Sequence, residues 1–264
     1  MTEMFSNALA YEDMMGRWSV RLAPLLVKFA RIGDRGKILD VGCGTGSLTR
    51  VLAAESSRFE IVGIDPVQAF VEYARTKLTD PRVTFDRANA LDLPYAPGSF
   101  DHALSMLVLM FIPDPEKAAA EMCRVTRPGG TVAACTWDLV GLEMTALFWE
   151  EALKLDSEAE TRAERPRRLN QLGQLGALWR ATGLQNVEET TLEISTDFGS
   201  FEDYWRPFLR GVGPHGVYVT DLAPQRRDTL RNAIRKRLLG ERPDGPFSLG
   251  AKALAVRGSV PHAR

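Results

Sequence analysis

Short apolar runs alternate with amphipathic segments along the first half of the chain. Runs typical of strands buried on both faces lie at 38–41, 61–65, 83–85, 99–106 and 131–137. Apolar residues recur at helical spacing at 18–30, 48–52, 67–78 and 115–126. Strands that alternate with helices in this way predict an α/β fold with a mainly parallel sheet and helices on both of its faces.

The pattern loosens after residue 138. Helices are expected around 142–155 and 172–182, and strands around 187–195 and 248–257 are expected to finish the sheet as an antiparallel pair. About fifty residues separate these two strands, and Leu230, Ile234 and Leu238 mark a helix among them. An insertion of that length at a sheet edge is usually functional, so we expect a helical lid over a ligand.

A glycine-rich turn follows the first predicted strand. The stretch ILDVGCGTG carries Gly42, Gly44 and Gly46 at every second position, and helical spacing begins directly after them. Glycines reach backbone conformations that are closed to other residues, and they allow a ligand to lie against the main chain. We therefore expect a ligand at this turn.

Two acids narrow the class of that ligand. Asp40 lies inside the first strand, and Asp65 ends the next apolar run, nineteen residues after Gly46. A carboxylate in the second position suits the hydroxyl groups of a ribose. The dinucleotide pattern G-x-G-x-x-G would need a third glycine where this chain has Ser47. Two acids without a basic residue indicate an uncharged or cationic nucleoside.

These residues resemble the class I S-adenosylmethionine-dependent methyltransferases, most closely the group of ubiquinone and menaquinone biosynthesis methyltransferases with a methyltransferase type 11 domain. The resemblance covers roughly residues 10–138 and the motifs ILDVGCGTG, GIDPVQAFVEYAR, NALDLPYAPGSFDHALS and EMCRVTRPGGTV. It implies a doubly wound, Rossmann-like, seven-stranded sheet. Residues 1–138 would be the cofactor-binding core with an N-terminal cap helix. Residues 139–264 would complete the sheet and supply the lid helices of the same domain.

The glycine turn, the two acids and the resemblance together define a set of cofactor-binding residues. Arg17 is expected to meet the methionine carboxylate of S-adenosylmethionine; the alternative is that Arg17 is solvated beside a packed Trp18. Asn89 stands where the family usually has an acid beside the adenine, and an amide can still accept a hydrogen bond there. The expected residues are Tyr11, Arg17, Asp40, Gly42, Gly44, Gly46, Asp65, Pro66, Asn89, Ala90, Leu91, Met106 and Leu107.

The acceptor side of the site is less well defined. The pocket candidates are Met110, Trp137, Trp205 and Tyr218, with Tyr204 and Phe208 as further lid residues. Relatives often carry histidines where this chain has Met110 and Phe111. If the reaction uses a general base, the candidates are His215 and Asp138. No metal-binding pattern is visible, and the three cysteines have no C-x-x-C spacing.

The expected function is transfer of the sulfonium methyl group of S-adenosylmethionine to a small molecule. The rivals are a non-catalytic module that holds S-adenosylmethionine or S-adenosylhomocysteine, and a nicotinamide (NAD-dependent) oxidoreductase suggested by Tyr73 and Lys77 in the order Y-x-x-x-K. A net charge of −1 argues against nucleic-acid binding, although residues 226–237 are basic. Without a leader or a long apolar segment, we expect a cytoplasmic protein that does not insert into membranes. The sequence leaves the acceptor and the oligomeric state open.

Overall fold

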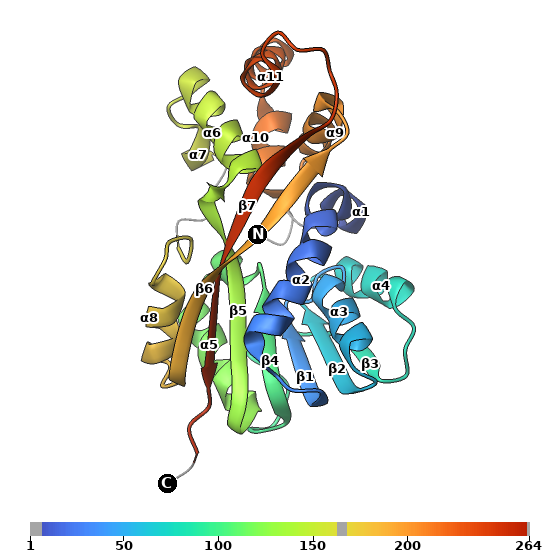
Figure 1. Cartoon of the computed structure of the whole chain (residues 1–264), viewed down its shortest axis with the longest axis vertical. Helices are drawn as coiled ribbons and strands as arrows, with labels where there is room; N and C mark the ends of the chain where they lie inside the picture. Colours follow the sequence, from blue (N-terminus) through green and yellow to red (C-terminus); the bar gives the residue numbers. More distant parts are fainter. Residues whose placement is uncertain (1–6, 163–167, 263–264) are drawn as a thin grey trace.

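The computed structural model describes residues 7–162 and 168–262, and its centre is one seven-stranded sheet in the order β3-β2-β1-β4-β5-β7-β6. β7 runs antiparallel to β5 and β6, and the other strand pairs are parallel. This confirms the predicted mainly parallel sheet with its antiparallel closing pair (Figure 1). The strands are β1 (Arg35–Val41), β2 (Arg58–Asp65), β3 (Val83–Arg87), β4 (Phe100–Met106), β5 (Thr126–Leu142), β6 (Gln185–Phe198) and β7 (Phe247–Ser259).

Helices cover both faces of the sheet because successive side chains of each strand point to opposite sides. Ile38 belongs to the apolar cluster on one face, and its neighbour Leu39 belongs to the cluster on the other. The first face is covered by α2 (Arg17–Ala30), α3 (Ser47–Glu55) and α4 (Gln68–Lys77), and the second by α5 (Pro115–Val125) and α8 (Gln174–Ala181).

The chain enters the sheet through a segment that the hydrophobic pattern only partly predicts. The short helix α1 (Ala8–Tyr11) continues as a π-helical turn, η2 (Glu12–Gly16), directly into α2. Asn7 begins α1, because its side-chain oxygen accepts a hydrogen bond from the Ala10 amide at 3.0 Å. Single π-helical turns are rare and occur frequently at functional sites.

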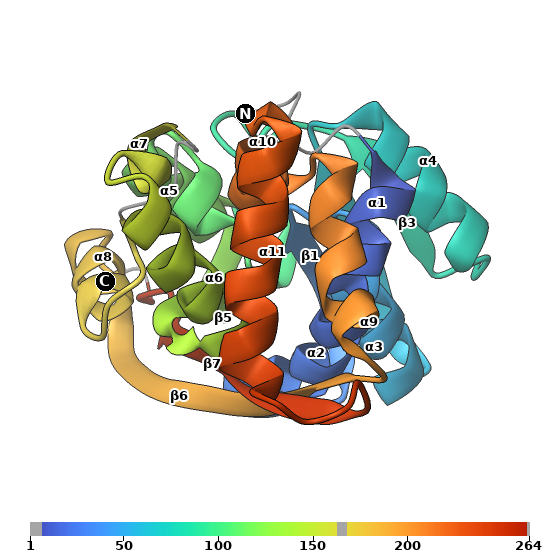
Figure 2. The ribbon, with the colours of Figure 1, turned by 90° about the horizontal axis from the view of Figure 1, so that it is seen from above.

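A second group of helices, which we call the cap, lies beyond the carboxyl ends of the central strands. It consists of α6 (Glu143–Leu155), α9 (Phe201–Trp205), η4 (Arg206–Arg210), α10 (Gly213–Asp221) and α11 (Pro224–Leu239). Figure 1 shows these helices together at one end of the molecule, with α7 (Ala159–Arg162) beside α6, and Figure 2 shows α11 running between α6 and α9. The expected helical insertion between β6 and β7 is therefore present.

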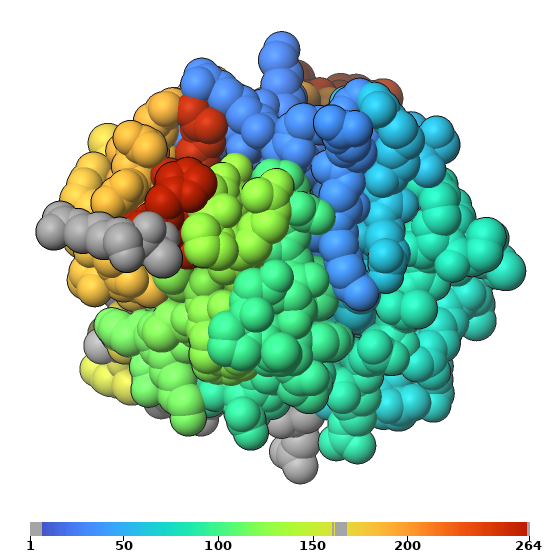
Figure 3. All heavy atoms as spheres, turned by 90° about the horizontal axis from the view of Figure 1, so that it is seen from below, coloured from blue at the N-terminus to red at the C-terminus, as the bar shows by residue number. Residues whose placement is uncertain are grey.

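The opposite end of the molecule is built differently. Seen from that side, the surface consists mainly of segments from the first half of the sequence, with α8 and β6 along one margin (Figure 3). No helix in the part of the chain that the structure describes is long and apolar enough to cross a membrane.

The cap is held to the rest of the chain by aromatic packing. Tyr204 and Phe208 are fully buried, and their ring centroids lie 5.2 Å apart. The Tyr204 hydroxyl donates a hydrogen bond to the Met144 carbonyl at 2.7 Å, which joins α9 to α6. Residues of α2, β1, α6 and the cap belong to one continuous apolar cluster. The cap is thus an extension of the core on one face of the sheet.

One local expectation is wrong. The fifth strand was expected at 131–137, after a break that follows the helical spacing of 115–126, but β5 already begins at Thr126 and includes Arg127-Pro128-Gly129-Gly130. Its pairing with β4 shifts register between Phe100 and His102, so the two glycines are absorbed as an irregularity of the strand. Gly129 has a φ of 77°, which a bulge can use and a regular strand cannot.

Candidate functional site

The glycine turn after β1 is fixed against two neighbouring strands. The amides of Gly42 and Cys43 both donate to the Ile64 carbonyl of β2 at 2.8 Å. Gly42 has a φ of 74°, and a Cβ atom there would lie 2.5 Å from the side chain of Val108. The turn therefore needs glycine at position 42 for its conformation and for its close contact with the segment after β4.

Asp65, the last residue of β2, organises this turn through its carboxylate. Its Oδ2 accepts a hydrogen bond from the Gly44 amide at 3.1 Å, and its Oδ1 accepts one from the Val67 amide at 2.9 Å. Burial raises the pKa of Asp65 to about 6, and the two amide donors oppose that rise. Each carboxylate oxygen has a second lone pair, so Asp65 can also accept hydrogen bonds from a ligand.

Asp40 in β1 has an incomplete set of partners. Its Oδ2 accepts a hydrogen bond from the Thr49 hydroxyl at 2.6 Å, whereas its buried Oδ1 has no hydrogen-bond partner among the described residues. The residue is 1% exposed, and burial raises the pKa of its carboxyl group to about 7. A buried polar atom without a partner is costly. Beside a cavity, it indicates a ligand that supplies the missing partner.

That cavity has a volume of about 350 Å³ and lies at the carboxyl ends of β1, β2, β3 and β4. β1 and β4 are neighbours in the sheet, and the strand order runs outward from them in opposite directions, so the cavity is at the topological switch point. The predicted residues that line it are Tyr11, Asp40, Gly42, Gly44, Asp65, Pro66, Asn89, Ala90, Leu91, Met106 and Leu107.

The structure adds lining residues that the sequence reasoning missed. Phe70 comes from the first turn of α4, Ser19 from α2 and Val108 from the segment after β4. Phe70 stands five residues after Asp65, in the GIDPVQAFVEYAR motif, which was the available signal. The ring centroids of Phe70 and Tyr11 lie 5.5 Å apart, so these two aromatic side chains form one wall of the cavity.

Two predicted cofactor residues do not line the cavity. The Arg17 guanidinium binds the Asp203 carboxylate of α9 at 3.0 Å and stacks on Trp18, with 4.3 Å to the ring centroid. The expectation that Arg17 meets a ligand carboxylate is therefore not supported. Gly46 faces Ala74 and Phe85 instead, and with a φ of 86° it begins α3. Gly46 thus allows the helix to pack close to the sheet.

A second, smaller cavity of about 70 Å³ adjoins the first, and the two share Tyr11, Leu107 and Phe111. Leu107 adopts a φ of 65°, which is uncommon for a residue other than glycine and often marks a functional site. The other residues that line the smaller cavity are Met14, Met15, Met110, Trp137, Leu139, Leu142, Met144, Thr145, Phe208, Gly213, Pro214 and His215.

The predicted acceptor residues divide into two groups. Met110, Trp137, Phe208 and His215 line the smaller cavity. Trp205, Tyr218, Tyr204 and Asp138 line neither cavity.

Packing explains the positions of the second group. Trp205 and Tyr218 are 2% and 4% exposed and belong to the large apolar cluster, as does Tyr204. Asp138 accepts a hydrogen bond from the Val140 amide at 3.0 Å, as a turn residue does. His102 of β4 also lines neither cavity, and its Nδ1 accepts a hydrogen bond from the Thr131 amide. His215 is therefore the candidate base that the structure brings to the site.

The larger cavity fits S-adenosylmethionine. None of its described lining residues is Lys or Arg, so it offers no cationic side chain for phosphate groups. Asp65 has acceptor capacity for ribose hydroxyls, and Ile64, Ala90 and Leu91 provide apolar surface for a purine. The unpaired oxygen of Asp40 suits a cationic or hydrogen-bond-donating group. Among the residues that the structure describes, no group of three His, Cys, Asp or Glu side chains could hold a metal ion.

The fold and this cavity define a nucleoside-binding α/β protein, and comparison with known proteins gives its family. Residues 39–134 match the family described as "Methyltransferase domain". This part of the chain is a methyltransferase domain, and the chain is related to the class I S-adenosylmethionine-dependent methyltransferases.

Individual relatives agree with the domain match. The chain is 34% identical over 155 residues to the chloroplastic tocopherol O-methyltransferase of Arabidopsis thaliana, covering 54% of this chain and 44% of the relative. It is 35% identical over 143 residues to the 27-O-demethylrifamycin SV methyltransferase of Amycolatopsis mediterranei, covering 51% of each. The chain spans about half the length of the curated relatives it matches.

A solved structure shows that the likeness in fold extends beyond the matched domain. Phosphoethanolamine N-methyltransferase 2 of Haemonchus contortus, solved in complex with S-adenosyl-L-methionine, superposes with a TM-score of 0.58 at 18% identity. The superposition covers 97% of this chain and 57% of that chain. The cap and the closing strands are therefore included in the shared fold.

Proposed function

We propose that this chain transfers the methyl group of S-adenosylmethionine to a small molecule. The observation that carries the proposal is the pair of buried acids, Asp40 and Asp65, at the switch point of a methyltransferase domain, in a cavity whose described lining includes no Lys or Arg. The two relatives named above are, by name, methyltransferases of tocopherol and of a rifamycin. A small-molecule acceptor for this chain follows from that likeness, and a cytoplasmic location stays a prediction.

The residues of the larger cavity divide the work of binding. Asp65 would accept hydrogen bonds from the ribose hydroxyls while it keeps its two bonds to the turn amides. Asp40 would stabilise positive charge on the ligand. Its unpaired Oδ1 would then gain a partner, which lowers the cost of burying the carboxylate. Phe70 and Leu91 would hold the purine between apolar surfaces.

The junction of the two cavities is where the reaction would occur. S-adenosylmethionine supplies a methyl group already activated by its positively charged sulfur. The protein has chiefly to align the acceptor and exclude water. Tyr11, Leu107 and Phe111 border both cavities, and burial raises the pKa of Tyr11 to about 12, so its hydroxyl stays protonated. Tyr11 can therefore donate a hydrogen bond at the junction but cannot act there as a base.

Calorimetric titration tests the proposal directly. S-adenosylmethionine and S-adenosylhomocysteine should bind in the micromolar range, which corresponds to about −8 kcal/mol, and NAD should not bind. Binding of NAD in place of the other two would support an oxidoreductase and overturn the proposal. Binding of both sulfur ligands without methyl transfer to any acceptor in a broad screen would favour a non-catalytic binding module.

Substitution of Asp65 locates the ligand within the protein. Asp65→Ala should weaken S-adenosylhomocysteine binding by about 1 to 3 kcal/mol, because it removes a hydrogen-bond acceptor for the ribose and loosens the turn amides. Asp86→Ala, which removes an exposed acid of the adjacent strand β3, is the matched control and should change the affinity little. Equal affinities for all three proteins would show that Asp65 does not contact the ligand.

A further inference from the structure

The smaller cavity is built almost entirely from apolar and aromatic side chains. None of its described lining residues is Asp, Glu, Lys or Arg. Thr145 contributes a hydroxyl, but that group donates to the Leu142 carbonyl at 3.2 Å. From this lining we propose that the cavity receives the methyl acceptor and selects an uncharged aromatic ring. The inference rests on the proposed function, because it assigns the second substrate of the same site.

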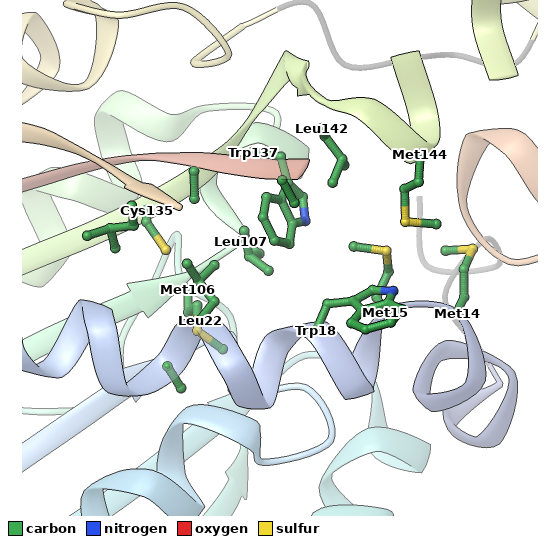
Figure 4. Packing of buried hydrophobic residues seen from close by; sticks show 14 of the residues in the cluster. Met14, Met15, Trp18, Leu22, Met106, Leu107, Cys135, Trp137, Leu142 and Met144 are labelled. Carbon is green, nitrogen blue, oxygen red and sulfur yellow. The ribbon is translucent and has the colours of Figure 1, made fainter. Parts of the chain in front are cut away.

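Four of the chain's eight methionines line this cavity. Met14 and Met15 come from η2, Met110 from η3 (Leu109–Phe111) and Met144 from α6. Figure 4 shows the side chains of Met14, Met15 and Met144 pointing toward one another near Trp137. Methionine side chains adapt to irregular shapes, and their sulfur atoms make favourable contacts with aromatic rings. A lining of this kind suits a planar ring.

Two ion pairs lie close to the cavity but outside its lining. Arg17 binds Asp203 at 3.0 Å, and Arg210 binds Asp13 at 2.8 Å. Each of these pairs joins the N-terminal segment to the cap, and none of the four residues lines the cavity. A carboxylate or ammonium group in the cavity would lose its hydration without gaining an Asp, Glu, Lys or Arg partner from the described lining, which is unfavourable. The structure therefore selects against charged acceptors.

The size and position of the cavity set the orientation of the acceptor. Its volume of about 70 Å³ is less than the ~150 Å³ of a cavity that encloses benzene. A single ring would therefore exceed it and extend into the junction at Tyr11, Leu107 and Phe111. The atom to be methylated would lie at that junction, facing the larger cavity. His215, on the wall formed by α10, is the imidazole that can take up a proton from an acceptor hydroxyl.

Methyl-¹³C-methionine NMR tests the inference, because each cavity has its own probe. Met106 lines the larger cavity, and Met122 lies in the apolar cluster on the other face of the sheet, where it serves as a reference. S-adenosylhomocysteine should shift the methyl signal of Met106. With that ligand bound, 4-methylphenol should shift the methyl signals of Met14, Met15, Met110 and Met144 and leave the signal of Met122 unchanged. 4-Methylbenzoate and 4-methylbenzylammonium, of similar shape, should shift none of the four.

The outcomes separate the inference from the proposed function. If S-adenosylhomocysteine does not bind, both the proposed function and the inference are wrong. If it binds but either charged ring shifts the four methionines at an equal or lower concentration than 4-methylphenol, only the inference falls. It falls likewise if 4-methylphenol and a second neutral ring, indole, both leave the four signals unchanged.

A charge introduced into the cavity provides a second test. Met144→Glu should weaken binding of 4-methylphenol roughly tenfold or more, because the ring would have to bury the new carboxylate. Leu153→Glu, a substitution at a 38% exposed position of the same helix, should leave that binding unchanged. Both variants should keep their affinity for S-adenosylhomocysteine, which also shows that they are folded. Equal ring affinity of Met144→Glu and Leu153→Glu would place the ring elsewhere.

Discussion

Asp40 makes the stability of the folded chain depend on pH. Burial raises its pKa to about 7, whereas an aspartate in an unfolded chain has a pKa of about 3.9. Well below pH 4 the residue is protonated in both states, so its ionisation does not change the free energy of unfolding. Between about pH 4 and 7 the folded state keeps a proton that the unfolded state has lost. The free energy of unfolding therefore decreases as the pH rises through this window.

Asp40→Asn should remove that dependence. An amide oxygen can still accept the hydrogen bond from the Thr49 hydroxyl, and the group no longer ionises. In urea unfolding without ligand, the free energy of unfolding of the wild type should decrease between pH 4 and pH 8 by roughly 2 to 4 kcal/mol more than that of the variant. Asp65, whose pKa is raised in the same direction, remains in both proteins and cancels in the comparison. Identical pH profiles would mean that Asp40 is not buried as the structure shows.

The same two acids mark what sequence reasoning can reach at the scale of single residues. Asp40 and Asp65 were predicted because their positions relative to the strand ends are fixed by local sequence. Arg17 was misplaced because its partner, Asp203, is 186 residues away. Trp205 was taken for a pocket residue on its aromatic character alone. Whether an aromatic side chain faces a cavity or the core depends on helices whose packing no local pattern specifies.

At the scale of elements, the N-terminal segment and the cap meet through two ion pairs. Arg17 at the start of α2 binds Asp203 of α9, and Arg210 of η4 binds Asp13 of η2. Met14 and Met15, which line the smaller cavity, belong to η2. In the sequence they lie between Asp13 of η2 and Arg17, the first residue of α2. These contacts therefore hold the π-helical turn against the cap. The elements themselves were largely predictable, but the π-helical turn was not, because hydrophobic spacing over five residues does not distinguish it from an α-helix.

Asp203→Asn should loosen this contact without unfolding the protein. The Arg17 and Asp203 side chains are 33% and 32% exposed, so the loss in the free energy of unfolding should not exceed about 1 kcal/mol. Hydrogen exchange should become faster in residues 12–17 and 201–210. Glu60→Gln breaks the more exposed Lys37–Glu60 pair, which joins β1 to β2, and should leave exchange in both segments unchanged. Unaltered exchange in Asp203→Asn would show that the pair does not hold the two segments together.

At the scale of the whole molecule, one apolar cluster connects both halves of the sequence. It includes Trp18 of α2, Trp137 of β5 and Trp205 of α9, all at most 5% exposed. The seven-stranded sheet and its closing pair were predictable from the order of the apolar runs. The joining of the cap to the first half was not, because it depends on contacts between α2, α6 and α9 that are distant in sequence.

We predict that the chain unfolds in one cooperative step. Because the cluster contains tryptophans from the N-terminal helix, the sheet and the cap, their fluorescence should change at the same urea concentration as the far-ultraviolet circular dichroism. Trp137→Phe and Trp205→Phe, which remove one reporter each, should give the same midpoint from fluorescence and from circular dichroism. Separate midpoints would show that the cap is a domain of its own.

The contact between the first helices and the cap also orders events during synthesis on the ribosome. The glycine turn and the strands β1 to β4 emerge early and can pair with one another at once. Met14 and Met15 emerge before any of them, but the η4 and α10 residues that line the same cavity are made only after β6. These two methionines must therefore wait for those partners while most of the residues between them are translated. The N-terminal segment is therefore a part of the nascent protein that needs shielding by a chaperone.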